Sequence, residues 1–210
     1  MELILIFSGA FIVGLSGALM PGPLMTITIS HSVKRGFIAG PLVILGHMIL
    51  EISLLIAIVL GFKNVISAPL AMKVVFIAGG AILIALGIDL MINHRKSTVP
   101  TGTTEKSALK KVFSHPIISG IVVSLSNPYW TIWWVTIGLG YVIKALKYGF
   151  LGITLFFSGH ILSDLIWYSF ISYTFSRGKK FFHDRTYHSI IFICGIFLIF
   201  FGLWFLYSGL

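Results

Sequence analysis

The 210-residue chain is strongly apolar: 57% of its residues are hydrophobic, only 10% are charged, and the mean hydropathy is +1.02. Soluble domains carry about 25% charged residues, so the composition excludes an ordinary soluble protein. A net charge of +9 is common in nucleic-acid-binding proteins, but here the basic residues lie between long apolar segments that leave no soluble domain for such a site. We predict an all-α integral membrane protein whose surroundings are the lipid bilayer, with no nucleic acid as partner.

Six segments of the chain are long enough to cross a bilayer, which takes about 20 apolar residues. Three of them contain no Asp, Glu, Lys or Arg, and each of the other three contains one acidic residue. We therefore predict six transmembrane helices. In chain order the segments are 3–33, 36–62 with Glu51, 74–94 with Asp89, 112–143, 148–176 with Asp164, and 186–210.

The basic residues are distributed unevenly between the two sides of this arrangement. Loops on one side carry eleven Lys or Arg residues, and loops on the other side carry four. Cytoplasmic loops of membrane proteins are enriched in basic residues, so we predict a multi-pass protein of the cell membrane with both termini outside the cytoplasm. The N-terminus lacks a basic region and a cleavage site, which argues against a removable signal peptide. The eleven residues are Lys34, Arg35, Arg95, Lys96, Lys106, Lys110, Lys111, Arg177, Lys179, Lys180 and Arg185.

Two of the predicted helices are interrupted. The first contains Pro21-Gly22-Pro23 and the fourth contains Asn127-Pro128, although a proline costs about 3 kcal/mol in a helix interior. A broken helix frees backbone groups that can bind a substrate near the middle of the membrane. The alternative is a kink that only shapes helix packing. We favour a substrate site that contains Pro21, Gly22, Pro23, Asn127 and Pro128.

Aromatic residues follow the second interruption directly, in the sequence "NPYWTIWW" (127–134). Tyr129, Trp130, Trp133 and Trp134 can form a cation–π wall against a substrate ammonium group, and we assign Trp130 and Trp134 to the substrate site. Trp and Tyr also anchor helices at the membrane interface, and the sequence leaves that alternative open.

The two halves of the chain resemble each other. Residues 34–51 and 147–164 share the pattern K-x-G-F-x8-G-H-x3-acid when they are aligned without a gap, and 80–87 and 195–202 both carry glycines seven apart. A repeat of three helices is odd-numbered, so the second copy must enter the membrane from the opposite side. We predict two inverted-topology three-helix repeats with broken helices 1 and 4, an architecture typical of secondary transporters. The expected divisions are a first repeat at 1–92, a cytoplasmic linker loop at 93–115 and a second repeat at 116–210.

The repeated pattern ends in a histidine and an acidic residue four positions apart: His47 with Glu51, and His160 with Asp164. Residues four apart share one helix face, and ionisable groups inside membranes usually face a helix bundle or a wet cavity. Because histidine titrates near neutral pH, we predict that these four residues form a proton relay. Two alternatives remain. One is a set of buried hydrogen bonds that lock helices together, and the other is a site for a divalent ion such as Mn, Ni or Zn in a metal-ion exporter.

The first interruption, "PGP" (21–23), is followed after twelve residues by Gly36-x3-Gly40-x5-Gly46, and this run resembles the N-terminal signature of the LysE family of amino-acid exporters. The chain length, the six hydrophobic segments, the polar central loop and the second interruption are also similar to that family. The resemblance implies a secondary-active transporter that exports amino acids or related small metabolites, with protons as the driving ion. We find no convergence of nucleophile, histidine and acid that would indicate an enzyme. We predict no cofactor and no resident metal ion, and the sequence is compatible with a homo-oligomer.

Overall fold

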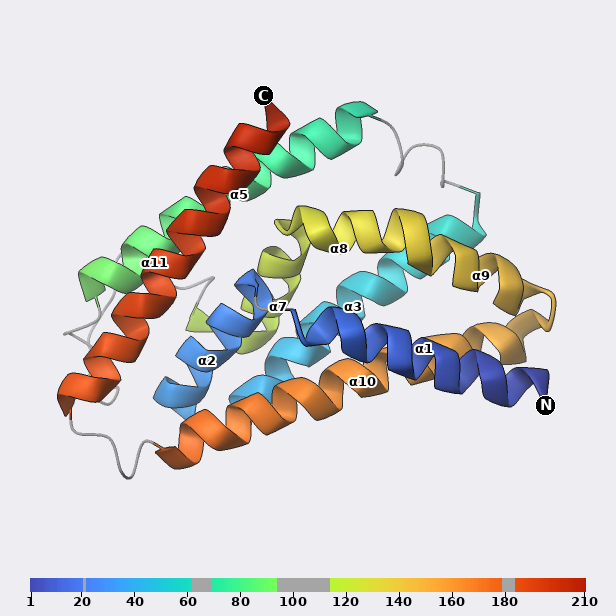
Figure 1. The fold of residues 1–210 in the computed structure, drawn as a ribbon, viewed down its shortest axis with the longest axis horizontal. Coiled ribbons are helices and arrows are strands. Elements are labelled where there is room, and N and C mark those ends of the chain that lie inside the picture. The colour runs from blue at the N-terminus through green and yellow to red at the C-terminus, as the bar shows by residue number, and fades with distance from the viewer. Residues whose placement is uncertain (21, 62–68, 94–113, 179–183) are drawn as a thin grey trace.

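The computed structural model describes residues 1–20, 22–61, 69–93, 114–178 and 184–210. Every regular element in these ranges is a helix (Figure 1), which confirms the predicted all-α class. Pro21 and most of the predicted linker (94–113) lie outside the described residues. The elements are α1 (Glu2–Ala18), α2 (Pro23–Arg35), α3 (Ala39–Val59), α5 (Pro69–Asn93), α7 (Pro116–Leu125), α8 (Pro128–Trp133), the π-helix η2 (Trp134–Gly138), α9 (Leu139–Leu146), α10 (Gly149–Gly178) and α11 (Asp184–Gly209).

Helix length and composition identify the membrane-spanning part of the chain. Among the described residues, four helices are long and apolar enough to cross a membrane: Ala39–Val59, Lys73–Ile92, Gly149–Gly178 and His188–Gly209. The bent pair α1–α2 passes the same test when its two helices are taken together, which gives up to five spans. The protein is therefore a multi-pass membrane protein. The sixth predicted span would have to consist of α7, α8, η2 and α9, and it stays a prediction.

The first predicted interruption is a sharp bend between α1 and α2. The two helices meet at 76°, with Gly22 in an extended conformation (φ −163°, ψ −175°) before the first residue of α2. Pro23 occupies that first helical position, where its missing N–H would have no intrahelical partner in any case. Pro23 therefore starts α2 without the loss of a backbone hydrogen bond in that helix.

The second predicted interruption separates α7 from α8. The chain leaves α7 after Leu125 and re-enters a helix at Pro128, and the side-chain Oδ1 of Asn127 accepts a hydrogen bond from the backbone N–H of Tyr129 (3.1 Å). Asparagine in this position satisfies one of the N–H groups that a helix start leaves free. Both breaks thus lie where the proline positions predict them.

Helices α5 and α11 form a close antiparallel pair along one side of the molecule (Figure 1). A Cβ atom built on Gly80 would lie 2.7 Å from the carbonyl oxygen of Gly202, and one built on Gly202 would lie 2.7 Å from the carbonyl oxygen of Gly80. Gly87 and Gly195 face each other in the same way. Small residues allow two membrane helices to approach until their backbones touch, which explains the glycines seven apart in both segments.

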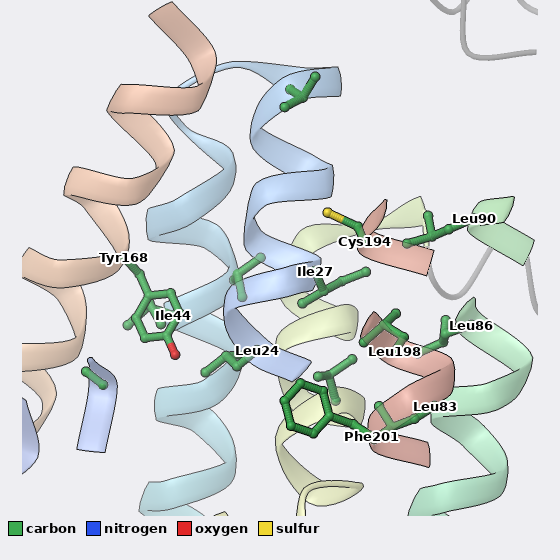
Figure 2. Close-up of a cluster of buried hydrophobic side chains, with 14 of the residues drawn as sticks. Leu24, Ile27, Ile44, Leu83, Leu86, Leu90, Tyr168, Cys194, Leu198 and Phe201 are labelled. Carbon is green, nitrogen blue, oxygen red and sulfur yellow. The ribbon is translucent and has the colours of Figure 1, made fainter. Parts of the chain in front are cut away.

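A cluster of apolar side chains packs this pair against α2 (Figure 2). In lipid, such packing stabilises the fold through van der Waals contact rather than through removal of apolar surface from water. The cluster therefore fixes α2, the second half of the broken first segment, to the α5–α11 pair. Its members include Leu24 and Ile27 of α2, Leu83 and Leu86 of α5, and Cys194, Leu198 and Phe201 of α11.

Two more close contacts position the middle of α3 and α10. Gly46 of α3 faces the carbonyl oxygen of Ile117 in α7. In the same way, Gly159 of α10 faces a backbone carbonyl oxygen of α1. A Cβ atom at either glycine would overlap the facing oxygen, so a larger residue would force the helices apart. Because His47 and His160 are the next residues along the chain, these contacts hold both histidines where α3 and α10 cross the broken helices.

Replacing Gly46 by alanine tests the contact between α3 and α7. The added methyl group would overlap the Ile117 carbonyl oxygen, so we expect the variant to lose about 1–3 kcal/mol of stability, measured as a lower Tm of the purified protein in detergent. Gly140→Ala is the matched control, because Gly140 is exposed on α9 and no atom lies within 4 Å of a Cβ built there. Equal melting temperatures for the two variants would contradict the close contact.

Candidate functional site

The four predicted His and acidic residues meet in one buried cluster. His47 and Glu51 come from α3, and His160 and Asp164 come from α10. One side-chain donor atom from each of the four lies within 4.8 Å of the others. Glu51 is 0% exposed and the other three are 5–6% exposed. We call these four residues the His/acid cluster.

Each histidine of the cluster contacts both acidic residues. The Nε2 atoms of His47 and His160 lie 3.1 Å and 3.0 Å from Oε1 of Glu51. The same two nitrogens lie 3.5 Å and 3.8 Å from Oδ2 of Asp164. The two pairs that are four apart in sequence therefore do not form separate sites, because each pair is completed by the pair on the other helix.

Two indole groups also donate hydrogen bonds to Glu51. Nε1 of Trp130 lies 3.1 Å from Oε1 of Glu51, and Nε1 of Trp134 lies 2.9 Å from the same oxygen. Together with Nε2 of the two histidines, four nitrogen atoms from α3, α10 and the α8–η2 segment converge on this one carboxylate oxygen. Hydrogen bonds to an ionised acceptor are about twice as strong as those between neutral groups, so Glu51 joins α3, α10 and the α8–η2 segment.

Aromatic rings enclose His160. The ring of Trp133 stacks on its imidazole, with centroids 4.5 Å apart and an angle of 20° between the planes. Trp134 meets the same imidazole edge-on at 5.9 Å, and Phe156 lies parallel to it at 6.3 Å. By contrast, the ring of Tyr129 packs against Trp204 and Phe205 of α11, so this aromatic residue of the "NPYWTIWW" run does not join the site.

The π-helix η2 starts at Trp134, in the middle of the aromatic run. π-Turns inside α-helices occur frequently at functional sites. Here the wider turn follows directly after α8, and both neighbouring residues, Trp133 and Trp134, contact the cluster. The sequence analysis did not predict this π-helix.

Residues near both helix breaks approach the cluster, one from α7 and one from α1. Nδ1 of His47 is 2.7 Å from Oγ of Ser124, which precedes the second break by three residues. On the other side, a Cβ atom built on Gly17, near the end of α1, would lie 3.6 Å from the indole of Trp133, which stacks on His160. The predicted site residues Gly22, Pro23, Asn127 and Pro128 lie in the breaks that follow α1 and α7, and Pro21 lies outside the described residues.

Ser124 is the site residue that sequence reasoning missed. It is buried and fixes the orientation of the His47 ring through Nδ1. A serine in an apolar helix next to an Asn-Pro break is the sequence feature that could have identified it. Trp133 was noted in the aromatic run but was not assigned to the substrate site, and its ring stacks on His160 of the cluster.

Three polar atoms of the cluster are buried without a hydrogen-bond partner among the described residues: Oε2 of Glu51, Oδ2 of Asp164 and Nδ1 of His160. A buried polar atom that lacks a partner costs about 1–3 kcal/mol. Such atoms are rare in folded proteins, and one explanation is a missing ligand or ion. The cluster therefore has unused capacity to accept a proton or to bind a positively charged group.

The donor set of the cluster also bears on metal binding. Two imidazoles and two carboxylates suit Mn, Ni or Zn, and their donor atoms are close enough together to surround one ion. However, Oε1 of Glu51 already accepts hydrogen bonds from two indoles, which occupy the lone pairs that a metal ion would need at this atom. A metal ion would therefore have to bind Glu51 through Oε2, which has no hydrogen-bond partner among the described residues.

Comparison with known proteins agrees with these features. The model of the "LysE type translocator" family matches residues 15–209. The protein named "Putative amino acid efflux protein YcgF" from Bacillus subtilis (strain 168) is 26% identical over 206 residues, which cover 98% of this chain and 97% of that protein. No solved structure matches the chain significantly. Because the family match extends from α1 to the last residue of α11 and includes both breaks and the whole cluster, the chain belongs to the LysE type translocator family.

Proposed function

We propose that this protein exports amino acids or related small metabolites across the cell membrane in exchange for protons. The observation that carries the proposal is the His/acid cluster, in which two long membrane helices bring four ionisable side chains together in a buried site. Membership in a family of translocators supports a membrane exporter. The Bacillus subtilis relative is named as an amino acid efflux protein, which supports amino acids as the substrates of the proposed exporter.

The geometry of the cluster supports proton exchange. Ionisable groups inside a membrane are costly and usually mark ion or proton pathways. The Nε2 atoms of both histidines lie between the carboxylates of α3 and α10, so a proton can pass from one helix to the other within the cluster. A purely structural role would favour complete hydrogen bonding, whereas Oε2 of Glu51 has no hydrogen-bond partner among the described residues.

The two breaks and the aromatic run form the proposed substrate site. The first hydrogen bond of α2 runs from the N–H of Thr26 to the carbonyl oxygen of Gly22 (3.0 Å), so the N–H groups of Leu24 and Met25 precede the first bond of the helix. A helix start of this kind attracts a carboxylate through its free N–H groups and its dipole. The proposed substrate contacts are Pro21, Gly22, Pro23, Asn127, Pro128, Trp130 and Trp134.

An inverted repeat of three plus three spans is the architecture that we propose for this function. Glycines at equivalent positions of α5 and α11 face each other. Gly46 and Gly159, which are also equivalent, each face a carbonyl oxygen of a helix from a broken segment. These relations support repeats at 1–92 and 116–210 joined by the linker at 93–115. In that arrangement the termini lie outside the cytoplasm, as the distribution of basic residues predicts.

Transport of a panel of substrates into proteoliposomes by counterflow tests the proposal. We expect at least one amino acid to give counterflow and Mn²⁺, Ni²⁺ and Zn²⁺ to give none, because Glu51 Oε1 is already hydrogen bonded to two indoles. Uptake of divalent ions without uptake of any amino acid would contradict the proposal and favour a metal-ion exporter. Empty liposomes are the control for leakage.

Amide substitutions of the two acidic residues test the role of protons. Glu51→Gln and Asp164→Asn keep the shape of the side chains but cannot lose a proton, so we expect folded proteins whose transport rate falls at least tenfold and no longer depends on pH. Glu2→Gln is the matched control, since Glu2 is exposed at the start of α1. If both cluster variants transport with the rate and pH profile of the unmodified protein, the carboxylates have only a structural role.

Alanine substitutions of the break prolines test the substrate site. Pro23→Ala and Pro128→Ala allow the helix to continue, so we expect the folded variants to lose the rise in Tm that a transported amino acid produces in the unmodified protein. Pro69→Ala is the control, because Pro69 also starts a helix but is exposed on α5. A ligand-induced rise in Tm that is unchanged in both break variants would mean that substrate binds elsewhere.

A further inference from the structure

His160 occupies a site that has the chemistry of an ammonium-binding site. One face of its imidazole stacks on Trp133 at 4.5 Å, and its Nε2 lies 3.0 Å from Oε1 of Glu51. An aromatic face beside a carboxylate is the arrangement that binds organic ammonium groups. Protonated His160 is therefore a cation of the protein itself, in a site whose chemistry would also suit the ammonium group of a ligand.

The acidic residues of the cluster can accept further hydrogen bonds from such a cation. Oε2 of Glu51 has no hydrogen-bond partner among the described residues. Oδ2 of Asp164 faces the Nε2 atoms of the two histidines only at 3.5 Å and 3.8 Å, and both acidic side chains are more than nine-tenths buried. Both atoms are acceptors, and an ammonium group offers three N–H donors. The unused capacity of the site thus fits a positively charged donor better than a substrate carboxylate.

From these observations we propose that the ammonium group of the substrate binds to the carboxylates of Glu51 and Asp164 in exchange for the proton carried by His160. The inference rests on the proposed function and adds to it the part of the substrate that the cluster recognises. The substrate class is then any amino compound with a protonated amine, and its carboxylate group binds elsewhere, at the helix breaks.

Charge balance makes this exchange one for one. With both carboxylates ionised and both histidines protonated, the cluster has two negative and two positive charges. Loss of the His160 proton leaves one negative charge in excess inside the membrane, which is costly. Binding of one ammonium group restores neutrality. A proton that enters from the more acidic side in turn displaces the substrate, so competition for the same carboxylates couples the two flows.

The ionisable groups around His160 influence how its proton competes with the ammonium group of the substrate. Glu51 and His47 face it from α3, and Asp164 lies one turn along α10. Tyr168 is the next titratable side chain along α10, close to Asp164. From α1, Gly14 faces Nδ1 of His160, and it has no ionisable side chain.

Ligand binding to the unmodified protein in detergent tests the proposal without any substitution. The probes are the amino acid that gives the fastest counterflow, its primary amide, which keeps the ammonium group, and its Nα-acetyl derivative, which lacks it. We expect the amide to bind with a Kd within about tenfold of that of the amino acid, and the acetyl derivative to bind at least a hundredfold more weakly. As pH rises and His160 loses its proton, the Kd of the amino acid should fall by up to about tenfold per pH unit.

Calorimetry in buffers of different ionisation enthalpy measures the exchanged proton directly. We expect about one proton to be released per amino acid bound at a pH where His160 is protonated, and none in His160→Gln. The matched control is His31→Gln, because His31 is also a buried histidine but is paired with Ser119 of α7 at 2.9 Å. This control should release the proton as the unmodified protein does.

Three results would overturn the inference. The first is equal binding of the acetyl derivative and the amino acid, and the second is binding without proton release at every pH. Either would leave the proposed amino-acid export intact, because counterflow is measured independently. The third is a failure of every amino acid to give counterflow, which would overturn the proposed function and this inference together.

Discussion

The carboxylate of Glu51 is the group on which the arrangement of the membrane helices depends. It is completely buried, and its Oε1 atom accepts hydrogen bonds from residues of α8, η2 and α10 while it belongs to α3. A buried charge that lost these partners would be strongly destabilising. The helices around it must therefore supply N–H groups at fixed positions, and the close glycine contacts at Gly46 and Gly159 bring them near enough to do so.

The two kinds of helix in the protein have different roles at this site. The long helices α3 and α10 carry all four ionisable residues of the cluster. The broken segments supply the groups around it: Ser124 and the indoles from one, and the end of α1 beside Trp133 from the other. The ionisable groups thus lie on two uninterrupted helices, and the broken segments carry the groups that surround them.

Those features that depend on local chemistry could be predicted from the sequence. Proline removes a backbone donor wherever it occurs, so the positions of both breaks follow from Pro23 and Pro128 alone. The spacing of four residues between His47 and Glu51, and between His160 and Asp164, placed each pair on one helix face. The composition predicted a membrane protein, because long apolar segments without charged residues are typical of transmembrane helices.

What could not be predicted depends on how the helices cross. Sequence spacing does not reveal that α3 and α10 bring their two pairs together, because this results from tertiary contacts at glycines far apart in the chain. The π-helix at Trp134 was missed for a similar reason, since a wide helical turn has no distinctive sequence pattern. Ser124 was missed because one serine in an apolar helix is common, and only its 2.7 Å contact with His47 identifies it.

The hydrogen bonds from Trp130 and Trp134 to Glu51 link the chemistry of the site to its shape. Any movement that draws the α8–η2 segment away from α3 must remove the two indole donors from a carboxylate that is completely buried. The free-energy cost of such a movement becomes small only when another positive group or water reaches Glu51. In the proposed transport cycle, exchange of the cation at Glu51 and opening of the helix bundle would therefore be energetically coupled.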